Sequence, residues 1–230
     1  FSRCVSDCGI SWREIDRKFC EEKASQIVDE MLENMKAAGF AASKRYTVLL
    51  TRLKRVVARA AWMIAEHIRC SSFNPVGFEL EFGEGGEFPP VIIELDSGER
   101  VKLVGKIDRV DALETPEGTY LRIIDYKSGN KDFKLSDVFY GLQIQLITYM
   151  DALWNQDDGP GRFPGGILYF HQDDPVIKAA GRMTDEQLEQ ALKKTFRMKG
   201  LLLADVKLIR EMDNTIDGTS MIIPARINKG

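Results

Sequence analysis

Hydrophobic residues return at steps of three and four along the first third of the chain. Over residues 14–38 this stripe starts with Ile15 and ends near Met35, which is the spacing of one face of an amphipathic helix. Gly39 follows and is well suited to end that helix. A second stripe of the same period covers residues 43–69. The pattern therefore predicts two long helices in succession.

The period changes from helical to alternating after residues 71–75, a polar stretch with a proline that is typical of a linker. Residues 78–82 alternate phenylalanine or leucine with glutamate, as in a strand with one solvated face. Further strands are predicted over residues 91–95, 100–113 and 119–127, with tight turns at 96–98 and 115–118. We expect these strands to form an antiparallel meander of three or four members.

Helical and apolar segments alternate in the rest of the chain. A helix is predicted over residues 136–154, and the apolar run 165–170 predicts a buried strand that can join the sheet through a crossover. Thr184 and Gln187 have the spacing of a capping box at the start of a helix that ends near Met198. The remaining predictions are a buried segment at 201–203, a short helix over 205–212 and a last strand over 220–224.

This order of elements predicts an α/β fold with a mixed sheet. We divide the chain into an N-terminal helical segment at residues 1–70, a core at 71–204 and a C-terminal extension at 205–230.

Composition narrows the possible partners only slightly. The 230 residues carry a net charge of -3, so any contact with DNA must come from local patches of positive charge. No apolar run approaches the ~20 residues that span a bilayer, and no signal peptide opens the chain. The sequence therefore predicts a cytoplasmic protein with no membrane partner. Because the chain begins with Phe1 rather than Met, we expect it to be an excised fragment.

The cysteines give no clear metal site. Cys4, Cys8, Cys20 and Cys70 are spaced irregularly and include no Cys-x-x-Cys pair. Four cysteines could hold zinc or an iron–sulfur cluster, but this spacing fits no ligand pattern well. Free thiols are the preferred interpretation.

One face of the second predicted helix is basic. A solvated helix face is the usual meaning of such a pattern, and contact with a DNA phosphate backbone is the functional alternative. The face carries Lys44, Arg45, Arg52, Lys54, Arg55 and Arg59, of which Arg52, Lys54, Arg55 and Arg59 are our candidate DNA contacts.

The strongest candidate chemistry lies at the end of the strand 119–127. Asp125 and Lys127 share one face of that strand because strand side chains alternate, and Asp108 arrives from the preceding strand. Magnesium prefers hard oxygen ligands and keeps several waters. Two carboxylates and the main-chain carbonyl of Tyr126 would therefore suffice to hold it, with Lys127 beside the scissile phosphate. The common alternative is an ion pair at a sheet edge.

The next predicted helix supplies further polar residues for the candidate site. Gln145 and Tyr149 are four residues apart and so share a helix face, from which they could orient the lysine or contact DNA. A packing face of mixed polarity explains the same spacing. His67 and His171 are isolated in the sequence, and we predict no catalytic role for them. No phosphate-binding loop, dinucleotide motif or Ser/His/Asp arrangement is present.

Three motifs together resemble a known family. Gly-Lys-Ile-Asp-Arg-Val-Asp at 105–111, Ile-Asp-Tyr-Lys-Ser-Gly at 124–129 and Tyr-Gly-Leu-Gln-Ile-Gln-Leu-Ile-Thr-Tyr at 140–149 resemble the RecB-like branch of the PD-(D/E)XK nucleases. Residues 65–83 and 196–203 extend the resemblance to the C-terminal nuclease domain of the B subunits (AddB) of bacterial AddAB helicase–nucleases. The likeness covers nearly the whole chain.

That resemblance implies a restriction-endonuclease-like core behind an N-terminal helical segment. It implies that Asp108 and Asp125 are metal ligands, that Lys127 is the catalytic lysine and that Gln145 with Tyr149 forms the Gln-x-x-x-Tyr motif of the branch. Glu79 matches a glutamate on the first core strand of the family.

The family reaction is cleavage of DNA strands by an exonuclease that depends on Mg²⁺, for which Mn²⁺ can substitute. It processes double-strand-break ends ahead of recombination. A helicase–nuclease A subunit would be the partner, and the strand ending 5′, delivered from a duplex end, would be the substrate.

Two departures from the family pattern stand out. The branch has a metal-site histidine on a helix upstream of the core, which we expect to lie before Phe1, since His67 is too close to the first strand to replace it. Full-length family members also hold an iron–sulfur cluster on four cysteines, three of them close together near the C-terminus. The chain has no such trio, so we expect no cluster in this fragment. Two alternatives remain: a free-standing RecB-like exonuclease, or a degenerate nuclease fold that binds DNA or docks a subunit.

Overall fold

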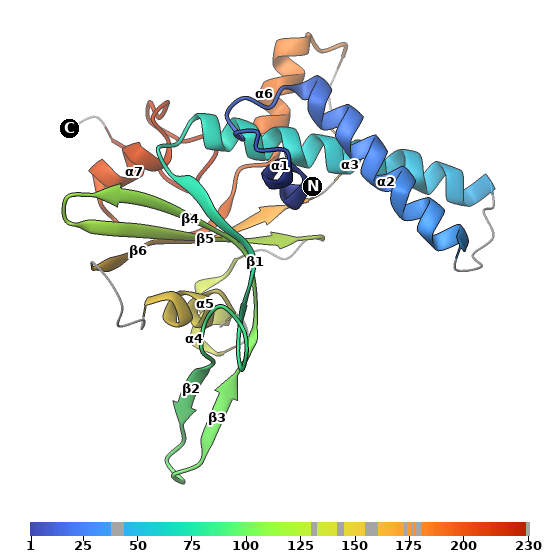
Figure 1. Ribbon diagram of the computed structural model, residues 1–230. Helices are drawn as coiled ribbons and strands as arrows, with labels where there is room; N and C mark the ends of the chain where they lie inside the picture. The colour runs from blue at the N-terminus through green and yellow to red at the C-terminus, as the bar shows by residue number, and fades with distance from the viewer. Residues whose placement is uncertain are drawn as a thin grey trace. The chain divides into compact units, whose positions relative to one another are not determined.

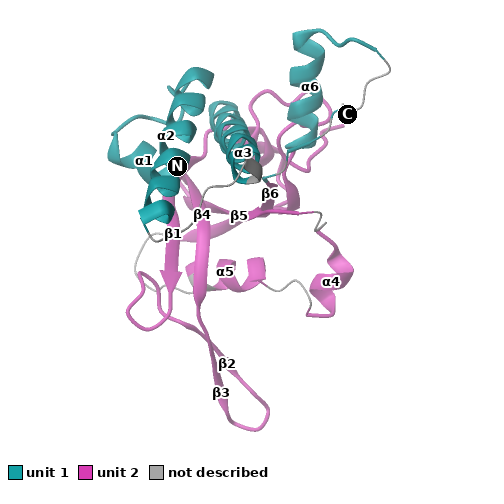
Figure 2. Ribbon diagram, turned by 90° about the vertical axis from the view of Figure 1, so that its right-hand side faces the viewer, with its two compact units in different colours: residues 1–70, 172–196 teal, residues 71–171, 197–230 magenta. Residues whose placement is uncertain are grey.

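The computed structural model describes residues 1–37, 44–129, 133–141, 145–154, 161–172, 174, 175, 177 and 181–228. They fall into two compact units, coloured separately in Figure 2. Residues 1–70 and 172–196 make up unit 1, and residues 71–171 and 197–230 make up unit 2. The division that we drew at residues 70 and 204 stays a prediction.

Unit 1 is helical. Its elements are α1 (Ser2–Asp7), α2 (Arg17–Ala37), α3 (Lys44–Arg69) and α6 (Asp185–Thr195). The two long helices predicted from the sequence are confirmed as α2 and α3, whereas α1 was missed because six residues are too few to show a period. The predicted stop at Gly39 lies outside the described residues. The capping box of Thr184 and Gln187 is present at the start of α6.

The apolar stripe of α3 is buried over only part of its length. Ala58 and Ile68 lie in the buried half, but Val48, Leu49 and Leu53 are exposed. The stripe predicted from the sequence is therefore buried only in the C-terminal half of α3. A pair of packed helices covers less surface than a helix in a layered core, so periodicity alone does not reveal how far burial extends.

Unit 2 contains a mixed five-stranded sheet in the order β1-β4-β5-β6-β7, and this confirms the predicted α/β class. Its strands are β1 (Asn74–Phe82), β4 (Gly105–Thr115), β5 (Gly118–Lys127), β6 (Arg162–His171) and β7 (Lys199–Leu202). Only β5 and β6 are parallel, which confirms the crossover connection predicted before β6. The helices α4 (Leu135–Phe139), α5 (Gln145–Trp154) and α7 (Val206–Met212) complete the unit (Figure 1).

Two boundaries in the sheet differ from the predictions. The run 100–113 is two strands rather than one, because β3 (Arg100–Leu103) pairs with β2 (Val91–Glu94) in a separate hairpin before β4 joins the main sheet. An alternating pattern does not report a change of partner strand. The stretch 71–75 was predicted as a linker, but β1 already begins at Asn74. Pro75 is tolerated there because β1 is an edge strand.

Two further predictions needed correction. The helix predicted over 136–154 is divided into α4 and α5, with residues 142–144 outside the described part. The predicted last strand at 220–224 is a set of bends, because Ser220 Oγ accepts hydrogen bonds from the amides of Ile222 and Ile223 and closes a turn. Leu201 and Leu202 lie in β7 but are only half-buried, and Leu203 is exposed.

One core cluster of unit 2 lies between the sheet and α5. Leu146, Tyr149 and Leu153 of α5 pack in one buried cluster with Ile123 of β5 and Ile167 of β6. α5 lies across one face of the sheet (Figure 1). The face of β5 that carries Ile123 therefore also carries Asp125 and Lys127 toward the start of α5. Among the described residues, no helix combines the length and apolarity needed to cross a membrane.

Candidate active site

β4 and β5 separate at the candidate site. Their antiparallel pairing runs from the Thr115–Gly118 end and stops at Arg109 and Ile124. Beyond that point β4 continues beside β1, and β5 continues beside β6 as far as Lys127. Asp108 and Asp125 are the next residues of the two strands, so the carboxylates lie where the sheet opens.

Each carboxylate has a defined partner in this opening. The amide of Tyr126 donates a hydrogen bond of 2.7 Å to Asp108 Oδ2, which replaces the strand pairing lost there. Asp125 Oδ2 lies 2.7 Å from Lys127 Nζ. Burial raises the pKa of Asp125, and the Lys127 ammonium offsets this effect only in part, while Asp108 adds to it. The charged form of Asp125 therefore calls for a further cation.

Lys127 is connected to α5 by a chain of polar contacts. Its ammonium donates a hydrogen bond of 3.0 Å to Gln145 Oε1, and Gln145 Nε2 donates to the Tyr149 hydroxyl. Burial alone would lower the pKa of Lys127, but the Asp125 carboxylate outweighs it and the pKa is raised. The lysine is thus held as a cation between a carboxylate and an amide.

Sequence comparisons identify the family of the chain. Residues 11–220 match the PD-(D/E)XK nuclease superfamily. The chain belongs to this superfamily. It is 67% identical over its full length to the B subunit of the ATP-dependent helicase/deoxyribonuclease of Acetivibrio thermocellus and 61% identical to that of Ruminiclostridium cellulolyticum. It is 49% identical to the protein of the same name from Clostridium novyi. The chain spans 20% of the length of each of these relatives.

The donor set fits the divalent metal expected of a PD-(D/E)XK nuclease. Asp125 Oδ2 is buried and contacts the Lys127 ammonium at 2.7 Å. Within the described residues no three His, Cys, Asp or Glu side chains gather as a metal cluster. Two carboxylates and the Tyr126 carbonyl, which points to the same side of β5 as its amide, are oxygen ligands suited to a hydrated magnesium ion.

Glu79 lies beside this donor set in register. Its neighbours Phe78 and Leu80 pair with the residues on either side of Asp108. Glu79 has a φ of 52°, which is uncommon for a residue other than glycine. Its carboxylate lies 3.2 Å from Lys106 Nζ. To act as a metal ligand, Glu79 would have to bind the ion in addition to Lys106 or in place of it. The role stays a prediction.

Tyr169 is a residue of this site that the sequence did not single out. It pairs with Asp125 in the parallel register of β5 and β6, and its ring centroid lies 5.4 Å from Lys127 Nζ. A cation over an aromatic face is stabilised electrostatically. Tyr169 lies in the apolar run of β6, and only the parallel register between the two strands brings it to the lysine.

A buried charge network on the opposite side of the strands was also missed. Asp111 accepts hydrogen bonds of 2.6 Å from both Arg109 Nε and Arg109 Nη2, and one of 2.7 Å from Arg122 Nη2. All three side chains are buried. Burial would raise the pKa of Asp111, but the two guanidiniums hold it below its usual range. This network joins β4 to β5 directly behind the opening.

The histidines and the cysteines differ in their surroundings. His67 is buried on α3 in unit 1, and His171 is buried at the end of β6. Cys20 is buried, and this burial raises the pKa of its thiol to about 11. In the described part of the chain, Cys4, Cys8 and Cys70 form no disulfide.

The predicted DNA contacts of α3 have acidic partners within unit 1. Asp174 accepts hydrogen bonds from Arg55 and from Arg59, the latter at 3.1 Å, and Arg52 Nε lies 3.3 Å from the same carboxylate. Lys54 contacts Asp29 at 2.6 Å. Three guanidiniums sharing one carboxylate leave an excess of positive charge. The acidic partner was not predictable because it lies 119 residues from Arg55.

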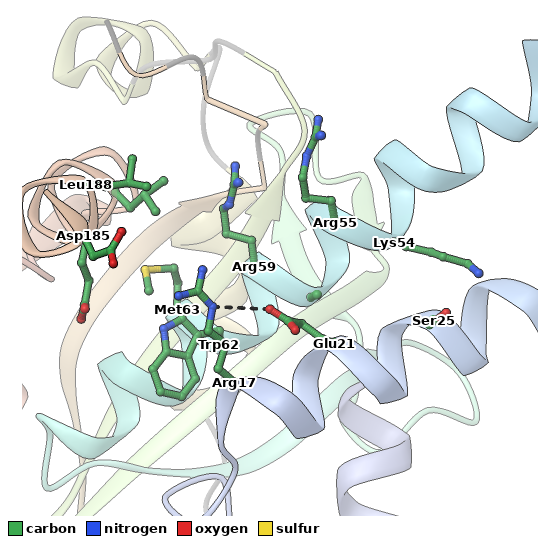
Figure 3. A pocket seen from close by; sticks show the side chains of 13 residues that line it. Arg17, Glu21, Ser25, Lys54, Arg55, Arg59, Trp62, Met63, Asp185 and Leu188 are labelled. Atoms are coloured by element: carbon green, nitrogen blue, oxygen red, sulfur yellow. Dashed lines mark ion pairs between the residues drawn. The ribbon is translucent and has the colours of Figure 1, made fainter. Parts of the chain in front are cut away.

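Three of the four basic residues, Lys54, Arg55 and Arg59, line a cavity of about 540 Å³ between α2, α3 and α6 (Figure 3). Its walls include Lys54, Arg55, Arg59 and Trp62, together with acidic residues such as Glu21. The dashed line in Figure 3 marks the ion pair of Glu21 with Arg17, at 3.5 Å. Four basic and three acidic side chains line the cavity, and this mixture points to no particular ligand.

Proposed function

We propose that the chain is the nuclease domain of a helicase–nuclease and that it hydrolyses phosphodiester bonds of DNA. The observation that carries the proposal is the opening between β4 and β5, where Asp108 and Asp125 meet and Lys127 contacts Asp125. Membership of the PD-(D/E)XK nuclease superfamily supports it. So does the name of the relatives, which are B subunits of an ATP-dependent helicase/deoxyribonuclease.

Asp108 and Asp125 would hold a divalent ion, with the Tyr126 carbonyl as a further ligand. Such an ion, Mg²⁺ or Mn²⁺, lowers the pKa of a bound water and neutralises charge on the scissile phosphate. The chain's own contribution is to fix these oxygens. The Tyr126 amide holds Asp108, and the buried position of Asp125 makes its charged form depend on a cation.

Lys127 would stabilise the negative charge that develops on the phosphate oxygens. Its ammonium is held 2.7 Å from Asp125 Oδ2 and 3.0 Å from Gln145 Oε1, so its position is set before substrate arrives. A donor that is already oriented needs little reorganisation during the reaction. Gln145 is in turn oriented by Tyr149. We therefore assign Lys127 the catalytic role, with Gln145 and Tyr149 positioning it.

The finer assignment goes beyond the names of the relatives and rests on the resemblance of the three sequence motifs to the RecB-like branch. The domain would act as an exonuclease on one strand delivered from a duplex end, during resection of double-strand breaks for recombinational repair. The A subunit of the helicase–nuclease would be its partner, and the cytoplasm its location. In full-length relatives an iron–sulfur cluster is expected elsewhere in the subunit.

The first test combines metal binding with DNA degradation. Calorimetry with Mg²⁺ or Mn²⁺ is expected to detect binding to the intact protein and to lose it in the double variant Asp108→Ala, Asp125→Ala. Linear DNA is expected to be degraded only when the metal is present. Metal binding unchanged in the double variant would refute the metal site. DNA binding without cleavage would instead favour the non-catalytic DNA-binding alternative.

A second test concerns the basic face of α3. If it contacts DNA phosphates, replacing Arg52, Lys54, Arg55 and Arg59 with glutamine is expected to weaken binding several-fold. The slope of log affinity against log salt is expected to fall by about 0.9 per lost contact with duplex DNA. Fluorescence anisotropy over a salt series measures both. Lys18→Gln on α2, an exposed lysine of the same unit, is the matched control. An unchanged slope would leave the solvated-face interpretation.

A further inference from the structure

β6 ends at a buried histidine beside the candidate catalytic lysine. In the parallel register, Asp125 pairs with Tyr169 and Lys127 pairs with His171. Side chains two residues apart on a strand share a face, and the Tyr169 ring already lies 5.4 Å from Lys127 Nζ. His171 therefore occupies the next position along the same face, with 9% of its surface exposed.

One nitrogen of His171 contacts the segment that follows the lysine. Its Nδ1 lies 3.0 Å from the carbonyl oxygen of Gly129. A carbonyl oxygen only accepts hydrogen bonds, so Nδ1 must carry the proton and donate. This contact fixes both the tautomer and the orientation of the ring. Gly129, two residues after Lys127, has a φ of 113°, a conformation that favours glycine.

The main chain at Lys127 is paired with a neighbouring strand on one side only, so a further contact is needed to fix it. The pairing of β5 with β4 stops at Ile124, and its pairing with β6 stops at Lys127 itself. The strand therefore supplies no ladder hydrogen bond to the residues that follow. The hydrogen bond from His171 to the Gly129 carbonyl connects the chain to β6 two residues beyond the last strand pair.

The other nitrogen indicates that His171 does more than fill space. Nε2 is buried and has no hydrogen-bond partner among the described residues. A buried polar atom without a partner costs about 1–3 kcal/mol. An apolar side chain of similar size would avoid this cost. The imidazole is therefore explained by what its Nδ1–H does.

We propose that His171 is a positioning residue that fixes the catalytic lysine through the Gly129 carbonyl. The proposal rests on the nuclease function proposed above. The ammonium of Lys127 stands at the end of a flexible side chain, so its position depends on a fixed main chain as well as on Asp125 and Gln145. Releasing Gly129 would let residues 127–129 move and would weaken the alignment of the lysine with the phosphate.

Three variants of the intact protein separate this role from a merely structural one. His171→Ala removes the hydrogen bond and is expected to lower kcat about 10–100-fold, the size of effect seen when outer-shell partners are lost. KM and the affinity for Mn²⁺ are expected to stay unchanged. His171→Asn places an amide nitrogen near the position of Nδ1 and is expected to restore most of kcat. His171→Gln reaches instead toward the position of Nε2 and is not expected to do so.

Hydrogen exchange of the peptide that contains residues 127–129 gives a readout independent of turnover. It is expected to be faster in the alanine and glutamine variants and near the wild-type rate in the asparagine variant. His67→Asn replaces the other buried histidine, in unit 1, and controls for loss of a buried ring. Thermal unfolding of every variant identifies those that fail to fold.

The outcomes are distinct. Wild-type kcat in His171→Ala, or rescue by glutamine and not by asparagine, would overturn the role of Nδ1. Equal loss of kcat in the alanine and asparagine variants would do the same. Absence of metal-dependent cleavage by the wild-type protein would instead refute the proposed nuclease function.

Discussion

Replacing Lys127 with methionine is expected to reduce the rate of DNA cleavage about 10²–10³-fold, the usual effect of losing one oriented donor to a developing oxyanion. Methionine keeps an unbranched apolar stem and removes only the charge. Asp125 keeps its place in β5, so metal binding is expected to persist. Single-turnover cleavage of end-labelled linear DNA measures the chemical step, and calorimetry with Mn²⁺ measures the metal.

Lys102→Met is the matched control, because Lys102 lies on β3 in the separate hairpin and pairs with Glu84. We expect it to leave cleavage unchanged. If Lys127→Met retained the wild-type rate with bound metal, the lysine would have no part in the reaction and the contact with Asp125 would be an ordinary ion pair at a sheet edge.

Asp111→Asn is expected to destabilise the protein by about 3–5 kcal/mol. The substitution keeps the shape of the side chain but leaves two buried guanidiniums, Arg109 and Arg122, without a counter-charge. Breaking a buried ion network by removing one partner costs more than the network contributes, since the remaining charges stay desolvated. Thermal unfolding of the intact protein measures the loss as a fall in Tm of roughly 6–20 °C.

An exposed ion pair supplies the contrast. Glu94 and Arg100 pair at 2.8 Å across the β2–β3 hairpin, with both side chains about two-thirds exposed. Glu94→Gln is expected to change stability by less than about 1 kcal/mol. Replacing all three buried charges together, as Arg109→Met, Asp111→Leu and Arg122→Met, is expected to recover much of the stability. A small effect of Asp111→Asn alone would mean that water reaches the network.

The sequence was most informative where candidate site residues lie in a segment with a clear strand or helix periodicity. Asp125 and Lys127 follow an apolar strand, so their shared face could be predicted from alternation alone, and the contact between them agrees. Gln145 reaches that lysine as the spacing on one helix face suggested. The roles of these residues in catalysis remain predictions.

Features that depend on distant partners could not be predicted. Tyr169 reaches Lys127 only through the register of two parallel strands, which apolar runs do not encode. Asp174 pairs with Arg55 across 119 residues, so the basic face of α3 looked unpaired in the sequence. The division of 100–113 into two strands depends on which strand each half pairs with, and a hydrophobic pattern carries no such information.

The opening between β4 and β5 also bears on the order in which the site can assemble. Asp108 and Asp125 belong to adjacent strands of one hairpin, so a short loop closure brings them together, at little entropic cost. The surroundings of Lys127 require β6, which must return in parallel after the crossover that contains α5. Contacts between distant segments form slowly. The two carboxylates can therefore come together before β6 has joined the sheet beside Lys127. During folding, the capacity to bind a metal ion would precede the capacity to cleave DNA.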